Sequence, residues 1–189
     1  MSGHVSRRAS LRAAASGFVL ACAGCGAPAA DRGDRLQDAI AHCTGSVIFD
    51  GGEAAYQKSL SSLSPEESHL ALVAWCDTEV CNGGFHQFFL NSTGMVAPEA
   101  SKGFRAVGLP ECADLVDEAI GKFSSPYPRK QGERELALKS MIGSGPKGHE
   151  WNPFHELDTR YYAAKSRGRF DEVLAAYADR LPPLSKRAE

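Results

Sequence analysis

Apolar residues recur at three- and four-residue spacing along most of the chain, a pattern that predicts amphipathic helices. The clearest example is the segment 170–181, whose buried face would consist of Phe170, Val173, Leu174 and Tyr177. Pro182 and Pro183 end this pattern. No run shows the sustained alternation of apolar and polar residues that a half-buried strand requires, and no internal repeat is evident. The sequence therefore predicts an all-α fold.

Turn and capping residues divide the chain into further helices. Ser64, Pro65 and Glu67 give the clearest start signal, with Ser64 as the N-cap, Pro65 at the first helical position and Glu67 closing a capping box. The segment 45–52 should form a turn or a brief extended piece, and 124–128 should be a linker. The remaining helices are expected at residues 36–43, 53–60, 65 to the Gly83-Gly84 pair, 98–108, 110–120, 134–142 and after 153.

A cluster of aromatic residues lies between two turn signals near the middle of the chain. Its sequence is Asn82-Gly83-Gly84-Phe85-His86-Gln87-Phe88-Phe89, and Asn91-Ser92-Thr93-Gly94 follows. Gly83 and Gly84 can adopt positive φ at little steric cost and should end the preceding helix. Phe85, Phe88 and Phe89 recur at helical spacing and should be buried. This Gly-Gly corner predicts a helix–turn–helix structure in the core rather than a catalytic loop.

The N-terminal segment has the features of an export signal. Residues 6–12 resemble a twin-arginine motif around Arg7 and Arg8, with Ser10 in place of the usual apolar residue. The apolar run 13–23 is shorter than the roughly 20 residues needed to span a bilayer, but its length is typical of the apolar part of a signal peptide. An amphipathic first helix that is never removed is the alternative.

The end of this segment resembles a lipobox, Ala23-Gly24-Cys25-Gly26, in which the cysteine thiol would carry a diacylglycerol after cleavage. Cys22 is the competing frame, and we prefer Cys25. The predicted regions are a signal peptide at 1–24, a lipidated tether at 25–34 and one compact multi-helix domain at 35–189. The expected location is the periplasmic face of a bacterial cell envelope, with the acyl anchor in the lipid bilayer.

Signal cleavage would make the chain more acidic. The whole chain has 21 Lys and Arg against 23 Asp and Glu, a formal charge of −2. Loss of Arg7, Arg8 and Arg12 leaves 18 basic residues and a formal charge of −5. This mild negative charge favours solubility and disfavours nucleic-acid binding. The densest acidic patch, which should lie on one solvated helix face and form the candidate binding face for a protein partner, consists of Glu111, Asp114, Asp117 and Glu118.

Four cysteines follow the lipobox: Cys43, Cys76, Cys81 and Cys112. An even number of cysteines in an oxidising compartment predicts disulfides. On a continuous helix, Cys76 and Cys81 would project about 140° apart, which favours two bridges from them to Cys43 and Cys112 over a bridge between them. Four free buried thiols are the alternative.

No motif assembles a convincing reaction centre. The glycine-rich segment 143–148 fits a dinucleotide-binding pattern by spacing, but it contains a proline and does not connect a strand to a helix. His155-Glu156 lacks the second histidine of a zinc-protease helix. Cys76, Cys81 and His86 would diverge around a helix instead of converging on a metal. We therefore expect no cofactor, no metal and no catalytic residue.

The Gly-Gly corner, together with the segment 154–162, resembles the sequence pattern of the DNA-mimic-protein family, otherwise a domain of unknown function. The resemblance runs in register from about Ser64 to Tyr177 and implies an all-helical fold. Cys81 departs from the pattern, because a polar residue such as asparagine is expected there. The matching residues are Asn82, Gly83, Gly84, Phe85, Gln87, Phe88, Phe89, Asn91, Leu157, Asp158 and Tyr161.

This resemblance implies protein binding rather than catalysis, because the founding member is an acidic protein that imitates duplex DNA to occupy a DNA-binding regulator. We therefore expect an unidentified protein partner and no binding of nucleic acid. One alternative is an enzyme or accessory factor whose site includes His86, Glu79 and Gln87. Another is true DNA mimicry, against which export argues, because DNA-binding regulators are cytoplasmic.

Overall fold

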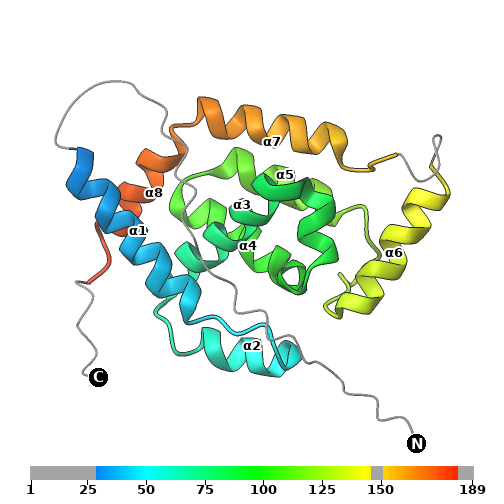
Figure 1. Ribbon diagram of the computed structural model, residues 1–189, viewed down its shortest axis with the longest axis horizontal. Helices are drawn as coiled ribbons and strands as arrows, with labels where there is room; N and C mark the ends of the chain where they lie inside the picture. Colours follow the sequence, from blue (N-terminus) through cyan, green and yellow to red (C-terminus); the bar gives the residue numbers. More distant parts are fainter. Residues whose placement is uncertain (1–28, 146–150, 183–189) are drawn as a thin grey trace, which may run out of the picture.

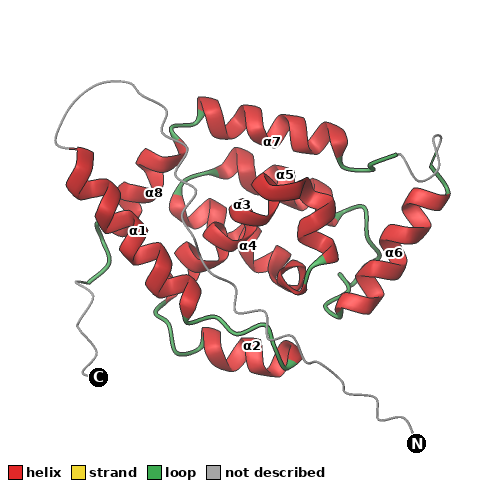
Figure 2. Cartoon of the chain, in the orientation of Figure 1, coloured by secondary structure: helices red, strands yellow, loops and turns green. Residues whose placement is uncertain are grey.

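The computed structural model describes residues 29–145 and 151–182, and every regular element in these ranges is helical (Figures 1 and 2). The predicted all-α fold is therefore confirmed for this part of the chain. The signal segment, Cys22 and Cys25 lie outside the described residues. The elements are α1 Ala29–Gly45, α2 Gly52–Leu60, α3 Pro65–Leu90, the 3-10 helix η1 Ser92–Val96, α4 Ala97–Val107, α5 Pro110–Ile120, α6 Gln131–Gly143, α7 His155–Arg167 and α8 Phe170–Ala178.

Helix α3 is the central element. It packs against α1, α4, α6, α7 and η1, and Figure 1 shows it beside α4 and α5, with α7 running along one side and α6 at one end. The five consecutive residues 70–74 are all buried. Neighbouring helices therefore surround this segment of α3 on most sides, as expected where a helix is apolar on every face. Its N-terminus has the predicted capping box, in which the Ser64 hydroxyl accepts the Glu67 N–H and the Glu67 carboxylate accepts the Ser64 N–H.

Several helices are longer or shorter than the sequence predicts. Helix α1 begins at Ala29, so residues 29–34, expected as part of a tether, are helical. The polar composition of that stretch suggested a tether, but the helix continues through Leu36, Ala39 and Cys43, whose burial in the core holds it in place. Helix α6 begins at Gln131 rather than at residue 134, and α8 ends at Ala178 rather than at 181.

None of the described helices is both long enough and apolar enough to cross a bilayer.

Candidate functional site

The Gly-Gly corner is a kink within α3 rather than its end. Gly83 and Gly84 have non-helical backbone angles, and helical structure resumes at once and continues to Leu90. A kink interrupts the i to i−4 hydrogen bonds and leaves backbone groups without intrahelical partners. Here α7 supplies two of those partners. The Asp158 carboxylate accepts the Phe85 N–H at 2.8 Å, and the Tyr162 hydroxyl donates to the Val80 carbonyl at 2.8 Å.

Gly84 is required at the kink for two reasons. Its φ of 72° and ψ of −179° lie in a region that is essentially restricted to glycine. A Cβ atom at this position would also lie 2.5 Å from Asp158 Oδ2. The absent side chain therefore permits both the backbone angle and the close approach of the carboxylate.

Asp158 is 8% exposed and joins the two halves of the family motif. Besides the Phe85 N–H, it accepts a hydrogen bond from the Asn152 side-chain amide at 3.1 Å. Burial raises the pKa of Asp158, while these two hydrogen bonds and the nearby His155 and His86 act in the opposite direction. The carboxylate therefore acts as a helix cap supplied from another helix, comparable to an N-cap side chain.

The polar residues of the corner converge on Glu79. Its Oε2 accepts hydrogen bonds from Gln87 at 3.1 Å and from Asn91 at 2.8 Å, and its Oε1 accepts one from Thr93 at 3.1 Å. Gln87 and Asn91 are one helical turn apart, so both can face the same carboxylate across the kink. This network explains the spacing of glutamine and asparagine in the motif, and it fixes the second segment of α3 relative to the first.

The enzyme hypothesis placed His86, Glu79 and Gln87 in one site. The structure uses Glu79 and Gln87 in the network above, whereas His86 is half-buried near Asp158. Within the described part of the chain, no acid or nucleophile lies within hydrogen-bonding distance of the His86 ring, and no group of three or more His, Cys, Asp or Glu side chains could hold a metal. Glu79 and Gln87 thus belong to the hydrogen bonds that join the two segments of α3.

Arg134, whose role no sequence pattern indicated, holds the other end of α3. The side chain is fully buried. Its guanidinium donates to the carbonyls of Phe89 at 2.9 Å and Asn91 at 2.7 Å, and also to those of Arg129 and Pro128. Carbonyls at a helix C-terminus lack intrahelical partners and attract positive charge. Arg134 therefore caps α3 from α6, and no sequence pattern distinguishes it from an ordinary surface arginine.

The remaining motif residues form the contact between α7 and α3. Phe85, Phe88 and Phe89 are fully buried, as predicted, and Leu157 and Tyr161 are buried with them. The Tyr161 ring packs edge-on against Phe85 at 5.6 Å between centroids. Its hydroxyl donates to Asp77 at 3.1 Å. Asn82, by contrast, is exposed, and the structure assigns it no contact that explains its place in the motif.

The four cysteines that follow the lipobox are free thiols in the structure. The predicted bridges from Cys76 and Cys81 to Cys43 and Cys112 are not formed. Cys43, Cys76 and Cys112 are buried, and burial raises the pKa of Cys43 and of Cys112 to about 12. They have the common role of cysteine as a small apolar core residue. Cys81, in contrast, is exposed. It lies at the surface where α3 meets α7, and Lys165 of α7 contacts its sulfur.

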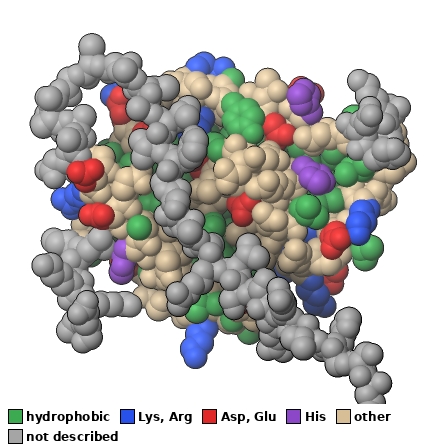
Figure 3. Space-filling view, viewed as in Figure 1, with side chains coloured by type: hydrophobic (Ala, Val, Ile, Leu, Met, Phe, Trp, Pro, Cys, Tyr) green, Lys and Arg blue, Asp and Glu red, His purple; other side chains and the backbone are tan. Residues whose placement is uncertain are grey.

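The predicted acidic patch is exposed on α5, but arginines neutralise most of its charge. Three of them pair with it: Arg105 from α4, and Arg160 and Arg167 from α7. The pairs are Arg105 with Asp114 at 2.9 Å and Asp117 at 2.6 Å, Arg160 with Glu118 at 2.8 Å, and Arg167 with Glu111 at 2.7 Å. Four carboxylates therefore face three guanidinium groups. Figure 3 likewise shows acidic and basic side chains scattered over the visible face, without a large patch of one sign.

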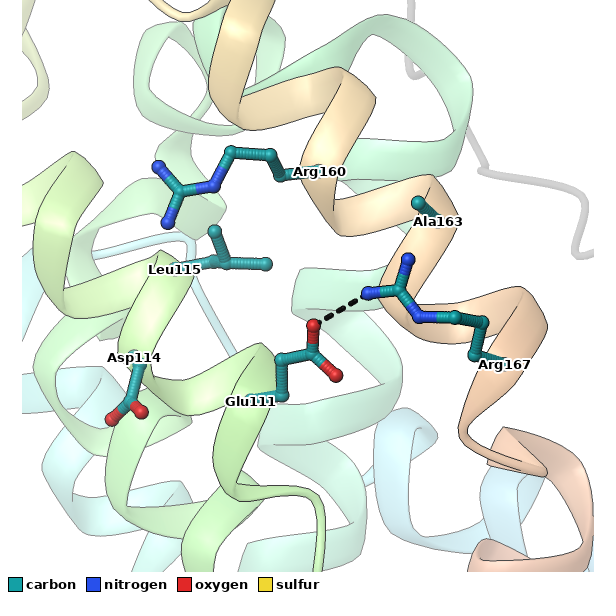
Figure 4. A pocket seen from close by; sticks show the side chains of 6 residues that line it. All are labelled: Glu111, Asp114, Leu115, Arg160, Ala163 and Arg167. Carbon is teal, nitrogen blue, oxygen red and sulfur yellow. Dashed lines mark hydrogen bonds and ion pairs between the residues drawn. The ribbon is translucent and has the colours of Figure 1, made fainter.

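A groove of about 260 Å³ lies on this surface between α5 and α7. Figure 4 shows Arg160 and Arg167 extending from α7 toward α5, with Leu115 between them. The groove is lined by Glu111, Asp114, Leu115, Arg160, Ala163 and Arg167. Leu115 and Ala163 are its two apolar side chains, and the other four lining residues are charged.

These features define an all-helical protein built around a kinked central helix, with the motif residues acting as its internal joints. The sequence model of the DMP19-like protein family matches residues 61–181, well over half of the chain. The chain therefore belongs to the DMP19-like protein family, which confirms the DNA-mimic-like resemblance found in the motif. No curated protein and no solved structure matches the chain significantly.

Proposed function

We propose that this protein acts by binding a protein partner through the exposed surface formed by α5 and α7, and that it catalyses no reaction. The main observation behind this proposal is that the polar side chains of the motif form hydrogen bonds within the fold. Glu79 and Asp158 each accept hydrogen bonds from within the fold. The α5–α7 surface, in contrast, directs its charged groups and its groove toward solvent.

The paired charges on this surface suggest how a partner would be recognised. Exposed ion pairs contribute only about 0–1 kcal/mol each, so a partner can exchange them for its own at little cost. Asp114 is the most accessible of the four acids, with 73% of its side chain exposed, and it shares Arg105 with Asp117. A partner with basic side chains would compete with Arg105 for these two carboxylates. Acids already paired with arginine are a poor imitation of a DNA backbone, which argues against true mimicry here.

Replacing both Asp114 and Asp117 with lysine should weaken partner binding about tenfold or more, because it places like charges opposite a basic partner. The measurement is affinity capture from intact envelopes, followed by binding kinetics with the captured protein. The association rate of the unmodified protein should fall as salt rises past about 0.1 M, where the Debye length is about 10 Å. The melting temperature should change little, since both side chains are exposed.

Asp34 and Asp38 provide a matched control, because both are exposed acids on α1 and their reversal changes the charge by the same amount. That double variant should bind as the unmodified protein does. Equal weakening by both variants would indicate an effect of net charge alone. If neither variant alters binding while His86→Ala abolishes the cellular phenotype in folded protein, the α5–α7 surface is not the site, and the enzyme hypothesis at the corner replaces it.

We further propose that the protein is exported and anchored in the cell envelope through a lipid on Cys25. The support comes from the order of the twin arginines, the apolar run and the lipobox. Single acyl chains bind membranes only marginally, so the several chains of a lipidated cysteine would be needed for stable anchoring. The domain would then act at the periplasmic face.

Cells supplied with labelled palmitate should incorporate the label into this protein, and the protein should sediment with membranes. Cys25→Ala should lose the label because the acceptor thiol is gone, whereas Cys22→Ala should keep it. The reverse result would move the lipidation site to Cys22. Absence of label from the unmodified protein, with the segment 1–24 still attached, would contradict export by this route.

A further inference from the structure

Cys81 and Lys165 form a close pair at the surface where α3 meets α7. Lys165 Nζ lies 3.3 Å from Cys81 Sγ and is held there by Asp77, whose carboxylate it contacts at 2.6 Å. The Cys81 thiol is exposed, so small oxidants can reach it. No other described cysteine has this combination, since Cys43, Cys76 and Cys112 are buried.

We propose that Cys81 and Lys165 are a modification site at which oxidation joins α3 to α7 through a covalent sulfur–nitrogen bond. The oxidant is a peroxide. The Cys81 thiolate attacks one peroxide oxygen, the O–O bond breaks, and the leaving hydroxide takes up the thiol proton as water, which leaves a sulfenic acid. Sulfenic acids condense with nearby nitrogen nucleophiles.

In the second step the neutral Lys165 amine attacks the Cys81 sulfur. The N–S bond forms as the S–O bond breaks, and the hydroxide leaves as water with a proton from the nitrogen. Overall, one thiol, one amine and one hydrogen peroxide give one sulfenamide and two waters. The sulfur is oxidised by two electrons and the peroxide is reduced. The two atoms begin 3.3 Å apart, so the step requires only a small movement of the flexible lysine side chain.

The surroundings of the pair determine its pH dependence. Cys81 is exposed, but its thiol is partly shielded from water by α7, and this partial desolvation together with the nearby Asp77 raises its pKa to about 11 against the opposing effect of Lys165. Burial lowers the pKa of Lys165, but Asp77 outweighs it and the pKa is raised. The first step needs the thiolate and the second needs the neutral amine, so the reaction should be slow at neutral pH and should accelerate at least about tenfold for each unit of pH below the pKa of Cys81.

The cross-link would join α3 to α7 beside the two segments of the family motif. Cys81 lies just before the kink, and Lys165 lies on the face of α7 that also carries Asp158 and Tyr161. A bond between them would hold α7 against the kink independently of the Asp158 cap. The proposal does not depend on partner binding or on export.

Treatment of the purified full-length protein with hydrogen peroxide at pH 9, followed by trypsin digestion without reductant, tests the proposal. Trypsin does not cleave at a modified lysine, so mass spectrometry should find residues 59–102 joined to 161–167, with two hydrogens fewer than the sum of the two peptides. Dithiothreitol should separate them. Because Cys76 lies in the same peptide, the Cys81→Ser variant is needed to assign the sulfur, and it should lose the cross-link.

Lys165→Arg is the matched variant, because it keeps the positive charge beside Asp77 but removes the nucleophilic amine. It should also lose the cross-link, while its Cys81 should still be oxidised. The proposal is overturned if peroxide converts Cys81 to sulfinic or sulfonic acid while trypsin still cleaves after Lys165. A cross-link that persists in Cys81→Ser would overturn it as well.

Discussion

Arg134→Met should lower the free energy of unfolding by about 4 kcal/mol or more. The substitution keeps most of the side-chain volume but removes the hydrogen bonds to the carbonyls of Phe89 and Asn91 at the end of α3 and to the carbonyl of Arg129 just before α6. Each buried polar group left without a partner costs about 1–3 kcal/mol. The carbonyls of Phe89 and Arg129 would lose this donor, and the carbonyl of Asn91 would keep the bond from the Gly94 N–H. Chemical denaturation followed by circular dichroism measures the loss, provided that unfolding is two-state.

Lys139→Met on the same helix is the control, because Lys139 is exposed and forms an ion pair with Glu135 one turn away. It should change stability by no more than about 0.5 kcal/mol. Arg134→Lys should fall between the two, since one ammonium group cannot reach carbonyls on both sides as a planar guanidinium does. Unchanged stability in Arg134→Met would mean that α6 does not hold the end of α3 in solution.

Gly84→Ala should also destabilise the protein strongly, by about 2–6 kcal/mol. The backbone angles alone cost about 1–3 kcal/mol for a non-glycine residue. The new methyl group would also displace the Asp158 carboxylate, because its Cβ would lie 2.5 Å from Oδ2. That movement breaks the bond to the buried Phe85 N–H, which adds about 1–3 kcal/mol.

A double-mutant cycle separates these two contributions. In an Asp158→Ala background the carboxylate is absent, so Gly84→Ala should cost only the backbone part, about 1–3 kcal/mol. The interaction energy between the two sites should therefore be clearly different from zero. If the losses of unfolding free energy from Gly84→Ala and Asp158→Ala simply add, the close approach of Asp158 to Gly84 has no energetic importance. Asp158 would then not be the residue that stabilises the kink.

The position of the kink was predictable, but its partners were not. Paired glycines next to three phenylalanines indicated an interruption of the helix and a buried aromatic cluster, because glycine tolerates positive φ and phenylalanine favours burial. The sequence could not show that α3 continues beyond the kink. Continuation depends on Asp158, which lies 73 residues after Phe85 and supplies the missing hydrogen-bond acceptor.

The acidic patch shows a different limit. The spacing of Glu111, Asp114, Asp117 and Glu118 correctly placed all four on the exposed side of one helix. The sequence did not show that arginines from α4 and α7 pair with these acids. Local spacing determines which way a side chain points, whereas its electrostatic environment depends on helices that are distant in the sequence.

The sequence by itself determined the helical periodicity, the capping box at Ser64, the glycine interruption and the family, because each depends on residues within a few positions of one another or on a local motif. Only the tertiary structure decided that Arg134 is buried, that Asp158 caps the kink, and that Cys81 lies against Lys165 rather than in a disulfide. These contacts join residues 45–84 positions apart. They form only when the packing of the apolar faces brings α6 and α7 against α3, and periodicity along the chain does not encode which polar side chains then meet.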